Sequence, residues 1–149
     1  MIKLIGIALI LMASTKIGAD IAVRFRNRVK DMKAIKMAIE IIRNEMNFNL
    51  KPLDEVLEKA SEGLPEKCKG LLLGKGDKCS FKPADKIKIR SFINSLGRSD
   101  IDTQMRNIDF FQKELVQMEE IAMVERDKYA KLALTLGICS GLVLALIIA

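Results

Sequence analysis

Residues 132–149 read LALTLGICSGLVLALIIA and hold no charged side chain. As a helix they would extend about 27 Å, close to the ~30 Å hydrocarbon core of a bilayer. Lys128, Tyr129 and Lys131 stand directly before them, and cations beside an aromatic ring are typical of a membrane interface. The alternative is a helix buried in a soluble core, but the length of the run favours a membrane span.

A second apolar stretch lies at the start of the chain, where residues 4–15 read LIGIALILMAST. Lys16 and Asp20 interrupt its extension to Val23, and each would cost about 2.5–3.5 kcal/mol at a bilayer centre. Lys16 can extend toward the interface, and the two residues are four apart, so they can pair on one helix face. We therefore expect a first membrane span over residues 1–23. The main alternative is a signal peptide cleaved near Ala19, which would leave an exported protein anchored by its tail.

The net charge of +6 is concentrated in one segment. Residues 24–36 hold six cations against one acid, whereas residues 37–131 hold 17 of each sign. A cationic cluster next to an apolar span predicts that residues 24–131 lie on the cytoplasmic side. The residues expected to fix this topology and to contact anionic lipid are Arg24, Arg26, Arg28, Lys30, Lys128 and Lys131. The balanced charge of the remaining segment argues against a nucleic-acid partner.

Both apolar stretches carry small residues at intervals of four. They are Ser14, Gly18 and Ala22 in the first, and Ala133, Gly137, Gly141, Ala145 and Ala149 in the second. Such stripes let helix backbones approach closely in lipid. We expect the two spans to pack together, or one of them to dock on another protein.

Proline and glycine divide the middle of the chain. The stretches 19–51 and 98–136 contain neither residue, which predicts two long helices that run into the spans. Three shorter helices are expected from Pro52 to Gly63, over 65–73 and over 83–96, with a turn at 75–78. The apolar positions expected to form the core of this bundle are Phe25, Val29, Met32, Ile35, Ile39, Ile42, Met46, Ile87, Phe92, Ile93, Leu96, Ile101, Met105, Ile108, Phe111, Leu115, Met118 and Ala122. Ser99 is expected to cap the last long helix, with Asp102 at its third position.

The chain offers little for catalysis or metal binding. It has no histidine, which excludes Ser-His-Asp and Cys-His mechanisms and Cys/His zinc fingers. Cys68 and Cys79 lack CxxC spacing, and on the cytoplasmic side they are expected to be reduced, although a bridge between them is geometrically conceivable. We expect no cofactor, no metal and no small-molecule substrate.

Four segments in order resemble the stage III sporulation protein AB family of endospore-forming bacteria. They are the opening MIKLIGIALILMAST with its exit IGADIAVRFRNRVKDMKAI, EIIRNEMNFNLKPLDEVL at 40–57, SLGRSDIDTQ at 95–104, and KYAKLALTLGICSGLVLALII at 128–148. The chain departs from the family pattern at Lys16, Val29 and Lys51, and residues 63–83 form a short central region.

This resemblance implies an all-α protein in which two transmembrane helices flank a cytoplasmic helical bundle similar to the type II secretion F-protein domain. It also implies a non-catalytic platform in the complex that joins the mother cell to the engulfed forespore. The expected location is the mother-cell membrane around the forespore. The partners implied are a secretion-type ATPase, other membrane proteins of that complex, and the bilayer itself.

Overall fold

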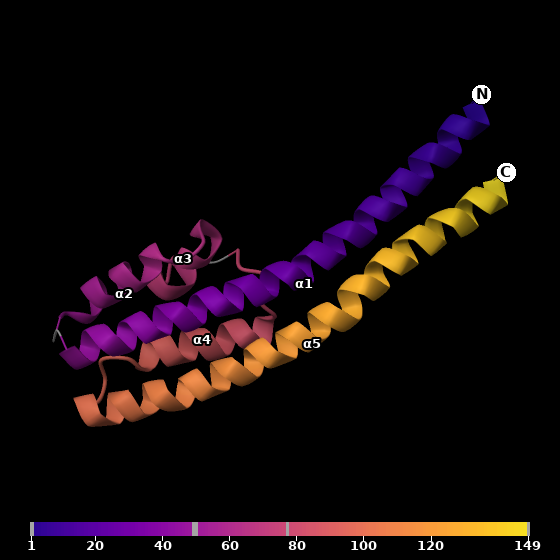
Figure 1. Cartoon of the computed structure of the whole chain (residues 1–149). Coiled ribbons are helices and arrows are strands. Elements are labelled where there is room, and N and C mark those ends of the chain that lie inside the picture. Colours follow the sequence, from indigo (N-terminus) through magenta and orange to yellow (C-terminus); the bar gives the residue numbers. More distant parts are fainter. Residues whose placement is uncertain (1, 49–50, 77, 149) are drawn as a thin grey trace. The chain divides into compact units, whose positions relative to one another are not determined.

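The computed structural model describes residues 2–48, 51–76 and 78–148, with side chains except at 2–4, 145 and 148. Within these ranges every regular element is a helix (Figure 1). The helices are α1 (Ile2–Phe48), α2 (Leu53–Glu62), α3 (Glu66–Leu73), α4 (Pro83–Ser95) and α5 (Ile101–Ile148). The predicted all-α class is therefore confirmed.

Proline and glycine set the ends of the short helices. Pro52 and Pro65 directly precede α2 and α3, and Pro83 is the first residue of α4. Proline is tolerated at the start of a helix, because the backbone N–H that it lacks would have no hydrogen-bond partner within the helix at that position. Gly63 ends α2, and Gly74 ends α3 in the left-handed region with φ 70°. The three short helices thus begin and end within a residue or two of the predicted positions.

The segment after α3 folds back closely over that helix. A Cβ added to Gly70 would lie 1.7 Å from the carbonyl oxygen of Gly76, so only glycine fits there. Gly76 has φ 82°, and the backbone N–H of Lys78 donates a hydrogen bond to the carbonyl of Lys67. The predicted turn at 75–78 includes Asp77, which lies outside the described residues.

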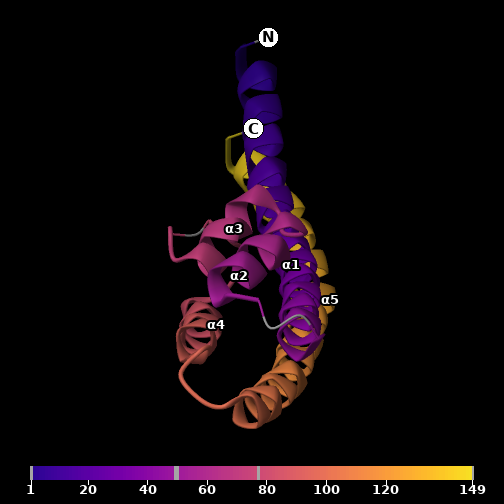
Figure 2. The same ribbon diagram turned by 90° about the vertical axis from the view of Figure 1, so that its left-hand side faces the viewer.

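The chain forms two compact units. Unit 1 comprises Met1–Asn27 and Ala122–Ala149, and unit 2 comprises Arg28–Ile121. The helices α1 and α5 contribute to both units. Within unit 2, α2 and α3 lie along α1, and α4 lies beside the first part of α5 (Figure 1, Figure 2). The helix α3 also packs against α2 and α4.

The core of unit 2 is formed largely by the predicted apolar positions of α1 and α5. The buried apolar residues that these two helices contribute are Val29, Met32, Ile35, Ala38, Ile39, Ile42, Ile108, Phe111, Leu115 and Met118. The rings of Phe111 and Phe92 stack with centroids 4.0 Å apart, which joins α5 to α4. Ile101, predicted to be buried, is exposed at the first turn of α5.

One predicted core position on α4 is wrong. Ile87 is 68% exposed, whereas Ile89 is completely buried. The buried face of α4 runs through Asp85, Ile89, Phe92 and Ile93. Because this face begins with an acid, the apolar pattern alone assigned the wrong isoleucine to it.

The cap of α5 also differs from the predicted one. The carboxylate of Asp100 accepts a hydrogen bond from the backbone N–H of Thr103 at 3.0 Å, and its carbonyl accepts one from Gln104. Asp100 is therefore the N-cap residue, one position after Ser99. These hydrogen bonds lower the pKa of the Asp100 carboxyl below its usual value of 3.8.

Candidate functional site: a glycine-lined helix pair and an ion-paired bundle

In unit 1, α1 and α5 approach each other closely where both helices carry glycine. A Cβ added to Gly18 would lie 2.7 Å from the carbonyl oxygen of Ala133 and 3.3 Å from Cα of Gly137. A Cβ added to Gly137 would lie 3.0 Å from the carbonyl oxygen of Ser14. Since Cβ atoms essentially never come within 3.0 Å of such neighbours, the approach at Gly18 requires glycine.

Two serine hydroxyls form hydrogen bonds with each other and with the backbone at this contact. Ser14 donates a hydrogen bond to the carbonyl of Gly137, and its Oγ lies 2.9 Å from Oγ of Ser140. Oγ of Ser140 lies 3.1 Å from the carbonyl oxygen of Gly137. Hydroxyl-to-carbonyl bonds between helices are a usual device for joining them in lipid. The pair therefore combines close backbone approach with a polar link.

The structure brings five of the eight predicted packing residues to this contact. They are Ser14, Gly18, Ala133, Gly137 and Gly141. Ala22 is buried one turn further along α1. The side chain of Ala145 lies outside those described, as does Ala149.

An apolar groove of about 390 Å³ follows one side of the pair. Gly18, Ala133 and Gly137 are among the residues that line it. The larger residues that line it are Ile17, Ile21, Tyr129, Leu132 and Leu136, and Ser14 and Ser140 supply its polar atoms. The exposed fractions of Ile17 and Leu136 are 63% and 58%. Such a surface suits contact with an apolar medium rather than with water.

An aromatic contact lies near the predicted interface. The rings of Phe25 and Tyr129 stack with centroids 5.7 Å apart, and Nζ of Lys128 lies 5.4 Å from the Tyr129 centroid. Lys128 and Lys131 are both exposed. These positions leave both lysines available for the predicted lipid contact, which stays a prediction.

The predicted cationic cluster divides into exposed and buried members. Arg24, Arg26 and Lys30 are exposed, as lipid contact requires. Arg28 is only 5% exposed, and its guanidinium forms an ion pair with Asp85 on α4, with Nη2 to Oδ2 at 2.7 Å. Arg28 therefore holds the bundle together and is not free to bind lipid head groups. The two residues are 57 positions apart, so sequence spacing gave no sign of the pair.

In unit 2, α1 is joined to each of the other four helices by an ion pair with a buried carboxylate. The pairs are Arg28–Asp85 to α4 at 2.7 Å, Asp31–Lys67 to α3 at 2.7 Å, Lys36–Glu119 to α5 at 2.7 Å, and Glu45–Lys59 to α2 at 2.5 Å. Breaking such a pair by removing one partner is strongly destabilising, because the other charge stays buried. These ion pairs therefore specify which helices lie next to α1.

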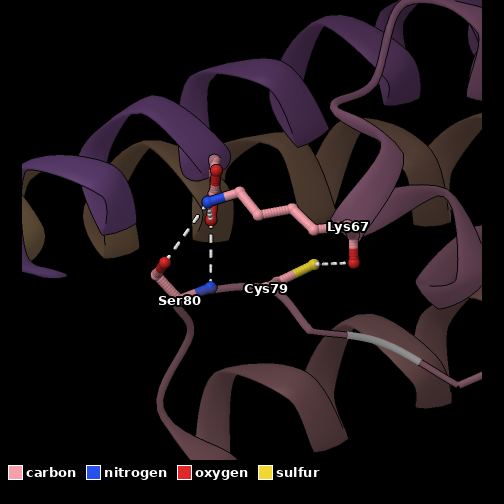
Figure 3. Close-up of polar contacts among 4 residues, drawn as sticks. Lys67, Cys79 and Ser80 are labelled. Carbon is pink, nitrogen blue, oxygen red and sulfur yellow. Dashed lines mark hydrogen bonds and ion pairs between the residues drawn. The ribbon is translucent and has the colours of Figure 1, made fainter.

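The most deeply buried of these carboxylates is that of Asp31, which is 1% exposed. Its Oδ2 accepts hydrogen bonds from Nζ of Lys67 at 2.7 Å and from the backbone N–H of Ser80 at 2.9 Å. Figure 3 shows the Lys67 side chain extending toward Ser80, whose Oγ lies 3.3 Å from Nζ. Asp31 thus fixes both α3 and the segment before α4. In the sequence it was only the single acid among six cations.

Cys68 and Cys79 are buried next to this site and form no disulfide bond. Cys79 Sγ lies 3.6 Å from the carbonyl of Lys67, as drawn in Figure 3. A hydrogen bond with Cys79 and burial raise the pKa of the Cys68 thiol far above its usual value. Because the thiolate is the reactive form, Cys68 is protected from modification in the folded chain, and burial shields Cys79.

The buried carboxylates Asp31, Glu45, Asp85 and Glu119 thus all hold helices together. Among the described residues, no group of three His, Cys, Asp or Glu side chains is placed to hold a metal ion. The helix within Ile5–Phe48 is the one described helix that is long and apolar enough to cross a membrane, which is weak evidence of a span by itself. The second predicted span, 132–149, stays a prediction.

Comparison with known proteins gives one result for this architecture. No curated protein and no solved structure matches the chain. The model of one family, described as stage III sporulation protein AB, matches residues 3–74 and 72–149. These two segments together cover almost the whole sequence, including both apolar stretches and the ion-paired bundle. The chain therefore belongs to the stage III sporulation protein AB family.

Proposed function

We propose that this chain is a non-catalytic membrane platform subunit of the complex between mother cell and forespore, required for endospore formation. In this proposal, residues 1–23 and 132–149 span the membrane and residues 24–131 form a cytoplasmic bundle. The observation that carries it is the contrast within α1. One end packs through glycine and exposes isoleucine and leucine, and the other end is joined by buried ion pairs to four helices. Family membership supports the sporulation role.

The orientation can be tested by thiol labelling, but not through the native bundle cysteines. Cys68 and Cys79 are buried, so they would remain unlabelled on either side of a membrane. We therefore place an accessible thiol at the exposed end of α2 with Glu62→Cys, in a chain carrying Cys139→Ser. An impermeant maleimide should label it only after the cells are permeabilised. The matched control carries Cys139→Ser alone and should stay unlabelled until it is denatured.

Labelling of Glu62→Cys in intact cells would contradict the cytoplasmic orientation. It would favour the alternative of an exported, tail-anchored protein with a cleaved signal peptide. Mass spectrometry of the amino terminus then separates these two cases. A retained first span leaves residues 1–23 on the mature chain, whereas cleavage near Ala19 removes the residues before the cleavage site.

We further propose that the subunit acts mechanically, by transmitting force between cytoplasmic partners and the membrane. Two helices, Ile2–Phe48 and Ile101–Ile148, each contribute to both compact units without a break in their hydrogen bonding. A Gly-Pro insertion after Lys30 should interrupt α1 and abolish spore formation. The control is the same insertion after Gly63, between α2 and α3, which should be tolerated better. Normal spore formation by a stable Lys30 variant would contradict the proposal.

The partners expected from the family resemblance are a secretion-type ATPase and other membrane proteins of the complex. Co-purification of the cross-linked full chain from sporulating cells should recover both. The stable but interrupted Lys30 variant should still bind the ATPase, because its bundle surface is retained. Absence of the ATPase from the native purification would contradict this part of the proposal and leave the membrane topology unaffected.

A further inference from the structure

The face of α1 that points away from α5 forms a second regular seam in unit 1. Successive residues rotate by about 100°, so residues two positions from Gly18 lie on the opposite side of the helix. The outer seam consists of Gly6, Leu9, Ala13, Lys16, Asp20, Val23 and Asn27. Its steps alternate between four and three residues, which is the spacing of a helix that pairs with another along its length.

The outer seam is unoccupied in the described chain. Leu9, Ala13, Lys16, Asp20 and Val23 are exposed, and Gly6 and Asn27 are half-buried. The exposed fraction of Leu9 is 58%, and that of Val23 is 47%. A Cβ added to Gly6 would meet nothing within 4 Å. The seam therefore combines small and apolar residues with room for close approach by another helix.

Two opposite charges interrupt this seam one turn apart. Among the described residues, Lys16 and Asp20 are exposed, and no ion pair or hydrogen bond joins either of them to another side chain. In a bilayer each lone charge would cost about 2.5–3.5 kcal/mol near the centre. Ionisable residues in a span usually pair with one another or face a protein partner. The charges therefore indicate that this face is covered.

We propose that the outer seam pairs with the same seam of a second copy of this chain in the membrane, through reciprocal Lys16–Asp20 ion pairs. Copies with the same topology pair in parallel about a two-fold axis, so a contact from residue i to residue j is repeated from j to i. In a parallel pair each seam position lies level with the same position of the partner, and a long side chain reaches the partner position one step along the seam. Lys16 of each copy thus meets Asp20 of the other.

The geometry and the charges favour a second copy over a different membrane protein. The axial offset between residues 16 and 20 is about 6 Å, which a lysine side chain spans. A cation and an acid at adjacent positions form a self-complementary pattern, so two identical seams neutralise all four charges. Gly6 and Ala13 let the two backbones approach, while Leu9 and Val23 supply apolar contact.

This inference rests on the proposed insertion of residues 1–23 into the membrane, so insertion is measured separately. Full-length chain with Cys139→Ser is reconstituted into vesicles of phosphatidylethanolamine and phosphatidylglycerol. Resistance to carbonate extraction reports insertion. Failure to insert would contradict the proposed topology, and it would remove the basis for pairing as well. Insertion without association would overturn the pairing alone.

Association is tested by cysteine cross-linking between inserted chains. Ala13→Cys lies on the outer seam, and Thr15→Cys is an exposed control at nearly the same depth but on another face. Oxidation should give several-fold more disulfide-linked dimer with Ala13→Cys than with Thr15→Cys. Equal yields would overturn the proposed seam.

The ion pairs are tested by reversing one charge in each of two chains. Lys16→Asp leaves two acids on the seam, and Asp20→Lys leaves two lysines. Each variant alone should give a yield of dimer cross-linked through Ala13→Cys that is lower by roughly fivefold or more. The reason is that losing the ion pairs weakens association in the membrane by about 1–2 kcal/mol. A mixture of the two variants should form heterodimers at the native level. No loss in the single variants would overturn the reciprocal pairs, and so would a mixture that fails to form heterodimers.

Discussion

The two ends of α1 achieve helix packing in opposite ways. In unit 1, Gly18 and Gly137 bring two backbones together, and the Ser14 hydroxyl donates a hydrogen bond to the carbonyl of Gly137. In unit 2, α1 contacts four helices through an apolar core and an ion pair to each of them. The first solution needs no hydrophobic driving force, so it suits the lipid surroundings proposed for unit 1. The second works in water, where burial drives assembly and charges select neighbours.

The largest expected effect comes from removing the cation of one buried pair. Arg28→Ala leaves the Asp85 carboxylate buried without its partner, and should lower the free energy of unfolding by about 3–5 kcal/mol. Thermal unfolding of the full chain in detergent, followed by circular dichroism, measures this loss. Arg24→Ala, at an exposed position four residues earlier, should change stability little. Equal losses in both variants would show that the pair does not stabilise unit 2.

Unit 2 also contains one backbone contact of the kind that dominates unit 1. Gly70→Ala would place a Cβ 1.7 Å from the carbonyl oxygen of Gly76, so the segment after α3 must move. Overpacking of this kind costs about 1–3 kcal/mol, which the same unfolding measurement detects. Gly63→Ala is the control, since a Cβ there meets nothing within 4 Å. A Gly70→Ala chain as stable as the control would mean that the segment after α3 can move aside without a loss of stability.

In unit 1 the contact at Gly18 should be sensitive to the size of the side chain placed there rather than to charge. Ser14→Cys with Ser140→Cys, in a Cys139→Ser chain, should form a disulfide because the native hydroxyls are 2.9 Å apart. Adding Gly18→Val should slow that disulfide, since contacts between membrane helices are worth about 1 kcal/mol. Gly6→Val is the control, because nothing lies within 4 Å of its added Cβ. Unchanged disulfide formation with Gly18→Val would refute the close approach of the two helices.

The smallest expected effect concerns the start of α5 and depends on pH. Hydrogen bonds from Thr103 lower the pKa of Asp100, so ionised Asp100 stabilises the folded chain above its unfolded pKa of 3.8. This contribution is lost as the pH falls through the lower folded value. Asp100→Ala should therefore reduce stability at pH 7 and make no difference near pH 2. Asp102→Ala serves as the control, and a difference that persists at pH 2 would exclude this cause.

The sequence predicted the helices well because their ends are encoded locally. Proline before α2 and α3, and glycine after them, act within one or two residues of a boundary. The small residues at 14, 18, 133 and 137 were also readable as a stripe, since helical spacing places them on one face. What the stripe would touch depends on a partner helix more than a hundred residues away, and only the structure showed it.

The errors arose where a polar residue belongs to the interior. Asp85 on the buried face of α4 hid the true core position, Ile89, and made Ile87 look suitable. Arg28 was read as part of a lipid-contacting cluster because its acid lies 57 residues away. Buried charges are predictable only as pairs, and pairing depends on tertiary contacts that spacing along one helix does not encode.

The position of α1 at the centre of the ion pairs has a consequence for synthesis on the ribosome. Its carboxylates Asp31 and Glu45 emerge before Lys67 and Lys59, and Glu119 on α5 lies 83 residues after Lys36. Contacts this distant in sequence form late. The nascent bundle therefore stays incomplete, with unpaired charges on α1, until α5 has been translated. Folding of the bundle thus coincides with delivery of the second apolar stretch, which follows on the same helix.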